Sequence, residues 1–424
     1  IDPAAVDAEK KIVLQEKNRR SELSERMRET SWPLFYAGLR IRERDTIGTE
    51  ATLKAADAEG VRAFYERWYR PERTTVIIAG DADPALMEEL IAKHFSGWIA
   101  TGPAPKEPDF GRPAAPPRRT ATLVYPSVPH SASVMWLRPY VARPNTRARE
   151  KEDLARSLAE RIINRRLEAK ARNGASYVVA GINETEEVET ADYTQLSVTA
   201  RGGEWRNALA ESFAIIADAM RAPPSESEIA RELSNIRSAA TSEGEGEARV
   251  RSQQRAQQMV AAIDGNSVVT TAPAALALID ELSAQMTPAL VGEAMKALFE
   301  GSGPRMVVTA PEAISLAEAE AALAAAEKAA PAERAAERQV SFDTLPPLGP
   351  EGREVSRQQI EDMDVTIVRF ANGSTLTFKE TDFEKGSVGV QLRFGSGIAG
   401  LDPRKVSIHP MGAVIAQSGL AGLD

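Results

Sequence analysis

Two glutamates near the amino-terminal end are the first candidates for chemistry. Glu9 and Glu16 lie in the stretch VDAEKKIVLQEKNRR, residues 6–20. Seven residues make almost two helical turns, so both carboxylates would project from one face of a helix. Asp2 followed by Pro3 provides an N-cap and a first-turn proline, and we expect one helix to continue from about residue 6 to 27. The pattern by itself fits either a chemical role or an ordinary solvated helix surface.

The residue types that usually complete a metal site are scarce. Cysteine is absent, which excludes disulfides, thiolate zinc ligands and thiol nucleophiles together. The three histidines are His94, His130 and His409, and none lies within four residues of another. A two-histidine helix site for zinc cannot be built locally from them, so we interpret each as a surface or loop residue. Any transition-metal site in this chain is therefore expected to be incomplete.

Length and composition are those of a globular protein with several domains. The chain has 424 residues, of which 43% are hydrophobic and 27% are charged, so two to four domains are expected. The net charge is -9 and the pI about 5.3, and no basic stripe indicates nucleic-acid binding. No apolar run is long enough to span a bilayer. The chain begins without a methionine or a signal peptide and ends soon after a new strand pattern, so we expect a fragment or a processed chain.

The first segment, residues 1–100, ends in a helix–strand–helix pattern. Its first helix is predicted by apolar residues at helical spacing, which are Val61, Phe64, Tyr65 and Trp68. TTVIIAG, residues 74–80, is typical of a strand, and Asp83 with Pro84 caps a second helix, on which Leu86 is expected to be buried. A proline-dense linker without periodicity follows at residues 101–119.

Residues 120–315 form a second segment that ends like the first. Strands are predicted in TATLVYP, SASVMWLRPY and YTQLSVTAR, and helices over about residues 150–172 and in SFAIIADAM. Ser225 with Glu228 has the pattern of a capping box for the next helix. GPRMVVTAPEAISLAEAEAAL repeats ERTTVIIAGDADPALMEELIA, with Val307 opposite Val76. A repeat of about 230 residues indicates duplicated domains.

An alanine-rich stretch leads to a third segment. Residues 316–340 favour a helix, and we interpret residues 316–360 as a helical connector. In residues 361–424, two apolar runs surround Asn372-Gly373, which predicts a hairpin. SVGVQLRFGSGIAG is expected to add a third strand, so that a further domain begins here and is truncated.

Together these motifs resemble the pitrilysin/insulinase family of zinc metallopeptidases, in its long four-domain bacterial form. FYERWYRPERTTVIIAGDAD with a helix ending in HFSGW resembles the end of that family's first domain, and TIGTEATL, residues 46–53, resembles the loop before it. FANGSTLTFKETD resembles the start of another family domain. The resemblance covers nearly the whole chain. It implies an α+β fold of duplicated domains with mainly antiparallel sheets packed by helices, like that of LuxS and the mitochondrial processing peptidase.

The resemblance also implies roles for the two glutamates. In this family an inverted H-x-x-E-H helix gives two histidine ligands and a general-base glutamate, and a later E-x6-E helix gives the third ligand. EKKIVLQE matches that later helix, which makes Glu16 the zinc ligand and Glu9 the accompanying acidic residue that orients or tunes the site. H-x-x-E-H is absent from the 424 residues. Two ligands and the general base are therefore missing, and we expect the chain as given to be proteolytically silent.

A second family feature is matched only in part. The family binds substrate with an arginine and a tyrosine seven residues apart, and LEAKARNGASYVV has Tyr177 in place but Lys170 where arginine belongs. Lysine keeps the charge but not the bidentate geometry of a guanidinium. We therefore expect a structural role for Tyr177.

The function implied by the resemblance is part of a zinc-dependent endopeptidase that hydrolyses peptides in a chamber between two halves, with Zn²⁺ as the cofactor of the intact protein. Its partners would be a peptide substrate and the remaining half of the same polypeptide or a partner subunit. The alternatives are a non-catalytic scaffold or partner subunit of the same family, and a peptide-binding module without hydrolysis. Similarity to long, exported bacterial members favours the periplasm, with the cytoplasm as the alternative.

Overall fold

The computed structural model describes residues 1–187, 189–247, 250–334, 347, 349–381, 388–393, 395, 400, 402 and 404. It divides into two compact units, Ile1–Glu333 (unit 1) and Arg334–Asp424 (unit 2), and each is described by itself. Among the described residues, no helix combines the length and hydrophobicity that a membrane crossing requires.

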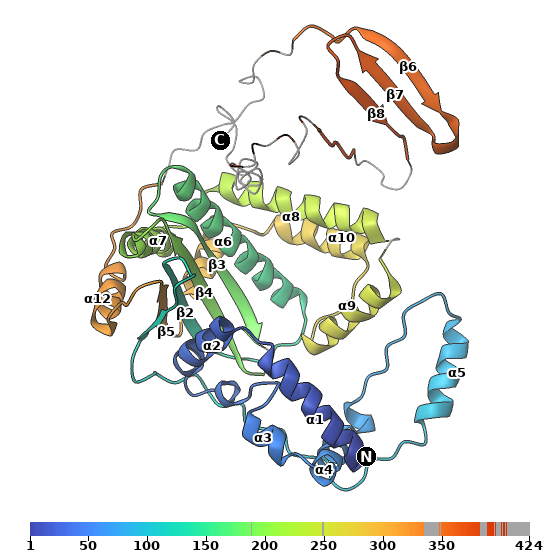
Figure 1. The fold of residues 1–424 in the computed structure, drawn as a ribbon, viewed down its shortest axis with the longest axis vertical. Helices are drawn as coiled ribbons and strands as arrows, with labels where there is room; N and C mark the ends of the chain where they lie inside the picture. The colour runs from blue at the N-terminus through green and yellow to red at the C-terminus, as the bar shows by residue number, and fades with distance from the viewer. Residues whose placement is uncertain are drawn as a thin grey trace. The chain divides into compact units, whose positions relative to one another are not determined.

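Unit 1 combines helices with one open sheet (Figure 1). Its α-helices are α1 (Pro3–Asn18), α2 (Glu22–Phe35), α3 (Glu50–Ala55), α4 (Ala58–Trp68), α5 (Pro84–Phe95), α6 (Arg147–Arg172), α7 (Trp205–Arg221), α8 (Glu226–Gly246), α9 (Ser252–Asp264), α10 (Ala272–Ser283), α11 (Pro288–Leu298) and α12 (Leu316–Ala326). Its strands are β1 (Thr120–Val124), β2 (Ser131–Pro139), β3 (Tyr177–Glu187), β4 (Ala191–Ala200) and β5 (Ser302–Ala310). Ser225 and Glu228 form the predicted capping box at the start of α8.

The sheet of unit 1 is mainly antiparallel, as predicted. Its strand order is β1-β5-β2-β4-β3. β1 runs parallel to β5, whereas β5 with β2, β2 with β4, and β4 with β3 pair in antiparallel fashion. The α+β class with antiparallel sheets packed by helices is therefore confirmed.

Both faces of this sheet are covered, as the alternation along β2 shows. Val134 and Trp136 point into a core shared with α6, α7, α11 and α12, whereas Met135 and Leu137 belong to a second core that includes the end of α2. Each of the four side chains is at most 5% exposed, and complete burial of a side chain of this size stabilises the fold by roughly 1.5–3 kcal/mol. Since successive strand side chains alternate between faces, a strand buried on both sides has the continuous apolar run seen here.

Arg305 on β5 joins the second face of the sheet to the amino-terminal segment. Its side chain is 1% exposed. The guanidinium donates hydrogen bonds to the carbonyl oxygens of Leu34 (3.0 Å), Phe35 (2.6 Å) and Ala114 (2.6 Å) and to Oγ of Ser302 (2.7 Å). Leu34 and Phe35 end α2, where helix carbonyls lack intrahelical donors. Burial lowers the pKa of Arg305, and no carboxylate is among these partners.

The free edge of β3 is capped by side chains of α6. Asn164 Nδ2 donates to the carbonyl oxygen of Ile182 (2.9 Å), and the N–H of Ile182 donates to Asn164 Oδ1 (2.7 Å). One helical turn away, Glu160 Oε2 accepts from the N–H of Glu184 (3.1 Å). β3 has a strand neighbour on one side only, so these bonds satisfy main-chain groups that an outer strand otherwise leaves open.

The helix expected from residue 6 to 27 is wrong in its length. α1 ends at Asn18 and α2 begins at Glu22, with Ser21 in extended conformation between them. The hydroxyl of Ser21 accepts the N–H of Ser24 at 3.1 Å. A serine that caps in this way starts a new helix, because its side chain satisfies a donor of the next first turn.

Residues 74–80 do not form the predicted strand. A strand needs a hydrogen-bonded neighbour, and within the described residues none pairs with this segment. Val307, its counterpart in the repeat, lies in β5, which has β1 and β2 on its two sides. The apolar side chains nearby are exposed instead of buried, for example Phe64 (60%), Ile78 (49%) and Leu86 (48%).

Unit 2 contains the predicted hairpin. β7 (Val365–Phe370) and β8 (Thr375–Phe378) flank Asn372-Gly373 and pair in antiparallel fashion. The third strand is β6 (Glu354–Ile360), on the other side of β7. The strand expected in SVGVQLRFGSGIAG is wrong for residues 388–393, which are described and unpaired. The connector helix expected over residues 316–340 ends at Ala326, shortly before Pro331, whose ring is incompatible with a helix interior.

Candidate metal-ligand surface on the first helix

Glu9 and Glu16 lie together on the solvent side of α1. Asp2 caps this helix as predicted, since its side chain accepts the N–H of Ala4 at 3.0 Å, and Pro3 is its first residue. Both glutamates are exposed. Within the part of the chain that the structure describes, neither carboxylate makes a hydrogen bond or an ion pair. Two unpaired carboxylates on one face are chemically free to bind a cation.

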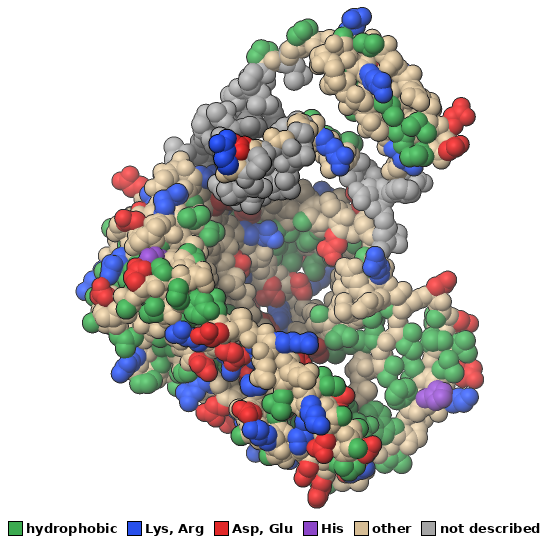
Figure 2. All heavy atoms as spheres, in the orientation of Figure 1, with side chains coloured by type: hydrophobic (Ala, Val, Ile, Leu, Met, Phe, Trp, Pro, Cys, Tyr) green, Lys and Arg blue, Asp and Glu red, His purple; other side chains and the backbone are tan. Residues whose placement is uncertain are grey.

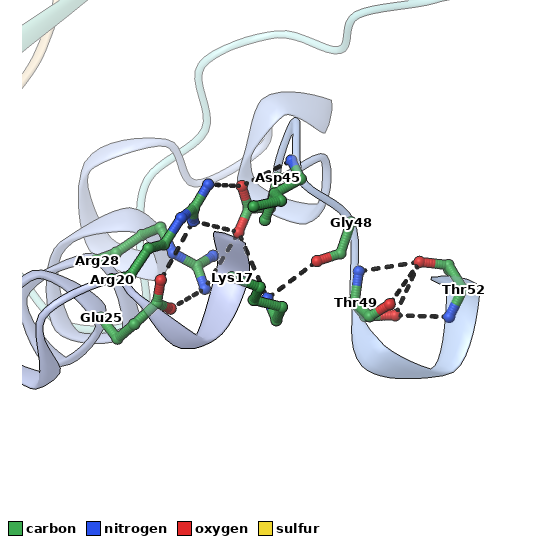
Figure 3. Close-up of polar contacts among 9 residues, drawn as sticks. Lys17, Arg20, Glu25, Arg28, Asp45, Gly48, Thr49 and Thr52 are labelled. Atoms are coloured by element: carbon green, nitrogen blue, oxygen red, sulfur yellow. Dashed lines mark hydrogen bonds and ion pairs between the residues drawn. The ribbon is translucent and has the colours of Figure 1, made fainter. Parts of the chain in front are cut away.

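A neighbouring face of α1 is attached to the segment that contains α3. Lys10 Nζ donates to the carbonyl oxygens of Lys54 (3.1 Å) and Ala56 (2.7 Å). Lys17 Nζ donates to the carbonyl oxygen of Gly48 at 3.0 Å (Figure 3). The two lysines are seven residues apart, as the two glutamates are, so they too share one face of the helix.

A half-buried carboxylate holds the corner between α1 and α2. Asp45 accepts two hydrogen bonds from Arg20, at 2.9 and 3.2 Å, and lies 3.4 Å from Arg28 (Figure 3). Burial opposes ionisation of Asp45, but the bonds from Arg20 and from the N–H of Ile47 outweigh it, so its pKa is lowered. Glu25 bridges the same two arginines, and its hydrogen bond from Arg28 lowers its pKa.

The described residues do not form a metal site by themselves. No group of three or more Asp, Glu or His side chains in the described ranges is placed to hold a metal ion. His94 is exposed on α5, and His130 is hydrogen-bonded to Glu312 at 2.6 Å. His409 lies outside the described residues. A catalytic zinc needs three protein ligands, so the donor set here fits one ligand of such a site and not the whole of it.

Tyr177 is placed as a core residue. Its side chain is fully buried, and its hydroxyl donates to the carbonyl oxygen of Leu167 at 2.8 Å. Burial raises its pKa. Lys170, which occupies the position of the family's arginine, is exposed on α6. The tyrosine is therefore engaged inside the protein and does not face a substrate.

A charged hollow over α6 was not anticipated from the sequence. Figure 2 shows basic and acidic side chains gathered in it, and it encloses a cavity of about 660 Å³. Asp192 lines it, and burial raises the pKa of this carboxyl to about 6. Glu160 lines it as well, and burial raises its pKa. The lining residues come from α6, α8, β3 and β4, with Arg143 from the loop before α6, so no local motif could have indicated that they meet.

Part of the chain matches a known protein family. The sequence profile described as the peptidase M16 inactive domain matches residues 55–236. A protein of Haemophilus influenzae described as probable zinc protease PqqL is 28% identical over 176 residues, which are 41% of this chain and 19% of that protein.

Two crystal structures share the fold. The periplasmic protease PqqL from Escherichia coli superposes with a TM-score of 0.68 at 19% identity, over 90% of this chain and 43% of that one. The first half of the same protease gives a TM-score of 0.69 at 20% identity, over 80% of this chain and 73% of that one. The chain thus spans less than half of the full PqqL. With the profile match and the sequence relative, these likenesses confirm the resemblance drawn from the motifs: residues 55–236 match the M16 peptidase inactive domain, and the fold is that of M16 proteases such as PqqL.

Proposed function

We propose that this chain is part of a zinc-dependent endopeptidase, in which α1 contributes Glu16 as one metal ligand and Glu9 beside it. The observation that carries the proposal is the E-x6-E pair of an M16 chain, held on one exposed helix face with both carboxylates unpaired.

The chain's own residues would act by binding and orienting. Glu16 would offer a carboxylate oxygen as a charged ligand, and Glu9 would fix the orientation of the site through hydrogen bonds. Zinc, when bound, supplies a water acidified enough to attack a peptide carbonyl. The peptide would enter a chamber between two halves. Similarity to a structure described as the first half of PqqL supports the assignment of this chain to one of them.

The first test uses the chain as given. Because one ligand cannot hold a catalytic zinc, we expect no hydrolysis of unstructured peptides with added zinc. If this chain alone cleaved peptides and a chelator abolished the cleavage, the proposal that it contributes only one of the zinc ligands would be contradicted.

The second test uses a chain that also carries an H-x-x-E-H segment. Glu16→Gln should weaken zinc binding and largely abolish turnover while the melting temperature stays unchanged, because an amide is an uncharged and poorer ligand. Glu9→Gln should lower turnover more than zinc content. Glu29→Gln, an exposed change on α2, is the matched control and should alter neither. Full zinc content and normal turnover in Glu16→Gln would refute the assignment.

The alternative function is a non-catalytic scaffold or partner subunit. It is favoured by the profile match, which is to a domain described as inactive. One observation distinguishes the two functions, which is whether the gene encodes an intact H-x-x-E-H upstream of residue 1. An intact motif supports the enzyme, and a degraded one supports the scaffold.

The location proposed for this chain is the periplasm. It rests on the similarity in fold to a protease described as periplasmic. Fractionation of cells with an antibody to the chain tests it, and recovery with cytoplasmic markers would contradict it.

A further inference from the structure

The rotation of α1 about its own axis is set by a stripe of residues that differs from the glutamate stripe. Lys10 and Lys17 are half-buried, as are Val6 and Val13, whereas Glu9 and Glu16 are exposed. Each glutamate precedes one of the lysines by one residue, which is about 100° around a helix. The two stripes are therefore rigidly related, and fixing the lysines fixes the direction of the carboxylates.

The segment around α3 presents carbonyl oxygens at the right spacing for both lysines. Lys17 binds the carbonyl of Gly48 just before α3, and Lys10 binds those of Lys54 and Ala56 at its far end. Carbonyls at the end of a helix lack intrahelical donors and attract cations. Lys10 and Lys17 are separated by about 10 Å of helix rise. The carbonyl acceptors at the two ends of α3 therefore lie about as far apart as Lys10 and Lys17 do on α1.

The corner after α1 fixes the position of the helix along its own axis relative to α3. Arg20 is bonded to Asp45, three residues before Gly48, and Asp45 is itself 9% exposed in its side chain (Figure 3). Lys17 lies 4.0 Å from the same carboxylate. Lys10 and Lys17 thus hold α1 at two points along its length, and Arg20 holds the chain just after its end.

We infer that Lys10 and Lys17 are positioning residues that set the rotation of α1 and so direct Glu16 toward the metal. This inference rests on the proposed function in naming the metal as the target. The rotation itself is a separate, measurable property of the chain.

The chain is suited to a direct measurement because it contains no cysteine. Glu16→Cys and Ser197→Cys, the latter exposed on β4, allow spin labels to report the distance from α1 to the sheet. With both lysines present we expect one narrow distance distribution. Lys10→Met with Lys17→Met should at least double its width. Lys11→Met, an exposed change on the same helix, is the matched control and should leave it narrow.

A replacement that keeps the donors guards against simple loss of folding. Lys10→Arg with Lys17→Arg should preserve the narrow distribution, because a guanidinium can still donate to the carbonyls. Tryptophan fluorescence reports whether the unit remains folded in each variant. An unchanged distribution in the folded double methionine variant would overturn the inference.

A zinc titration then separates the inference from the proposed function. In a chain that carries H-x-x-E-H, the double methionine variant should bind zinc about 10–100-fold more weakly, as expected when support of a ligand is removed. If the distribution broadens and Glu16→Gln leaves zinc affinity unchanged, the positioning role stands and the ligand assignment fails. If Glu16→Gln weakens zinc binding while the double methionine variant binds normally, the ligand assignment stands and the positioning role fails.

Discussion

Replacement of Arg305 by methionine is the sharpest test of how unit 1 is held together. The change removes a guanidinium that is 1% exposed and that bonds three carbonyls and one hydroxyl. Those acceptors come from α2, from the linker at residues 101–119 and from β5 itself. After the change, the carbonyls of Leu34 and Phe35, whose bonds to Arg305 are buried, lose this donor.

The magnitude follows from opposing terms. A hydrogen bond from a charged donor contributes roughly 1.5–3 kcal/mol, but the buried cation has already lost its hydration, so the four contributions do not add in full. Methionine also gains apolar burial. Leaving a buried carbonyl without a donor costs about 1–3 kcal/mol. Because the bonds to the carbonyls of Leu34 and Phe35 are buried, we expect Arg305→Met to lower the free energy of unfolding by about 2–5 kcal/mol. Arg305→Lys should cost about 1–3 kcal/mol, because an ammonium keeps the charge but reaches fewer of the acceptors.

Urea denaturation followed by tryptophan fluorescence measures this effect in unit 1 alone, since all five tryptophans lie between residues 32 and 205. Arg147→Met is the control, because the Arg147 side chain is 72% exposed and its ion pair with Glu281 lies at the surface. We expect a change of at most about 0.5 kcal/mol there. If Arg305→Met lowered the free energy of unfolding by less than about 1 kcal/mol, water or main-chain movement would have to satisfy the carbonyls. Arg305 would then not be what holds the amino-terminal segment to the sheet.

Two further predictions concern Asp192 and Gly48. Burial raises the pKa of Asp192 from 3.8 to about 6, so its contribution to stability is complete below about pH 4 and is lost as the pH rises through 6. Asp192→Asn should therefore be more stable than the parent protein at pH 8 and similar to it at pH 4, as measured by urea denaturation. An equal difference in stability at pH 4 and pH 8 would show that the raised pKa of Asp192 is not the cause. Gly48 has a φ of +76°, and a Cβ there would lie 3.0 Å from Thr52 Oγ1. Gly48→Ala should lower the free energy of unfolding by about 1–2 kcal/mol and speed hydrogen exchange in α3. Gly97→Ala, where a Cβ would have open space around it, is the control and should do neither. Unchanged hydrogen exchange in α3 of Gly48→Ala would refute the expected backbone strain.

The parts of the fold that sequence reasoning predicted are those with local causes. Asp2 and Pro3 mark the start of α1, and Asn372-Gly373 marks a hairpin, because capping and turn chemistry depend on adjacent residues. The spacing of Glu9 and Glu16 predicted that they share one face of α1, but it did not predict that this face is exposed. The break at Ser21 was missed because it lies in a continuous polar pattern without glycine or proline.

The parts that were missed depend on distant partners. The segment at residues 74–80 has the composition of a strand, but pairing is a property of two segments and not of one. β6 reads EVSRQQI, and it lacks the apolar alternation that predicts a strand because nearly all of it is exposed. Arg305 resembles a surface arginine in sequence, since nothing nearby indicates that α2 will cover it. Asp192 and Glu160 meet in one hollow only after β4 and α6 have packed.

Asn164 occupies the hydrogen-bonding position that one residue of a further strand would take on the outer edge of β3. A side-chain carboxamide is the same chemical unit as one peptide group, so Asn164 gives Ile182 the donor and the acceptor that a neighbouring strand would give. That unit is attached to a helix, however, and it offers no next residue to continue the ladder. An extended chain that approaches this edge therefore cannot pair with the main chain of Ile182, because Asn164 already occupies its donor and its acceptor. The hydrogen bonds of Asn164 therefore keep the sheet from growing at this position by the addition of a further extended chain.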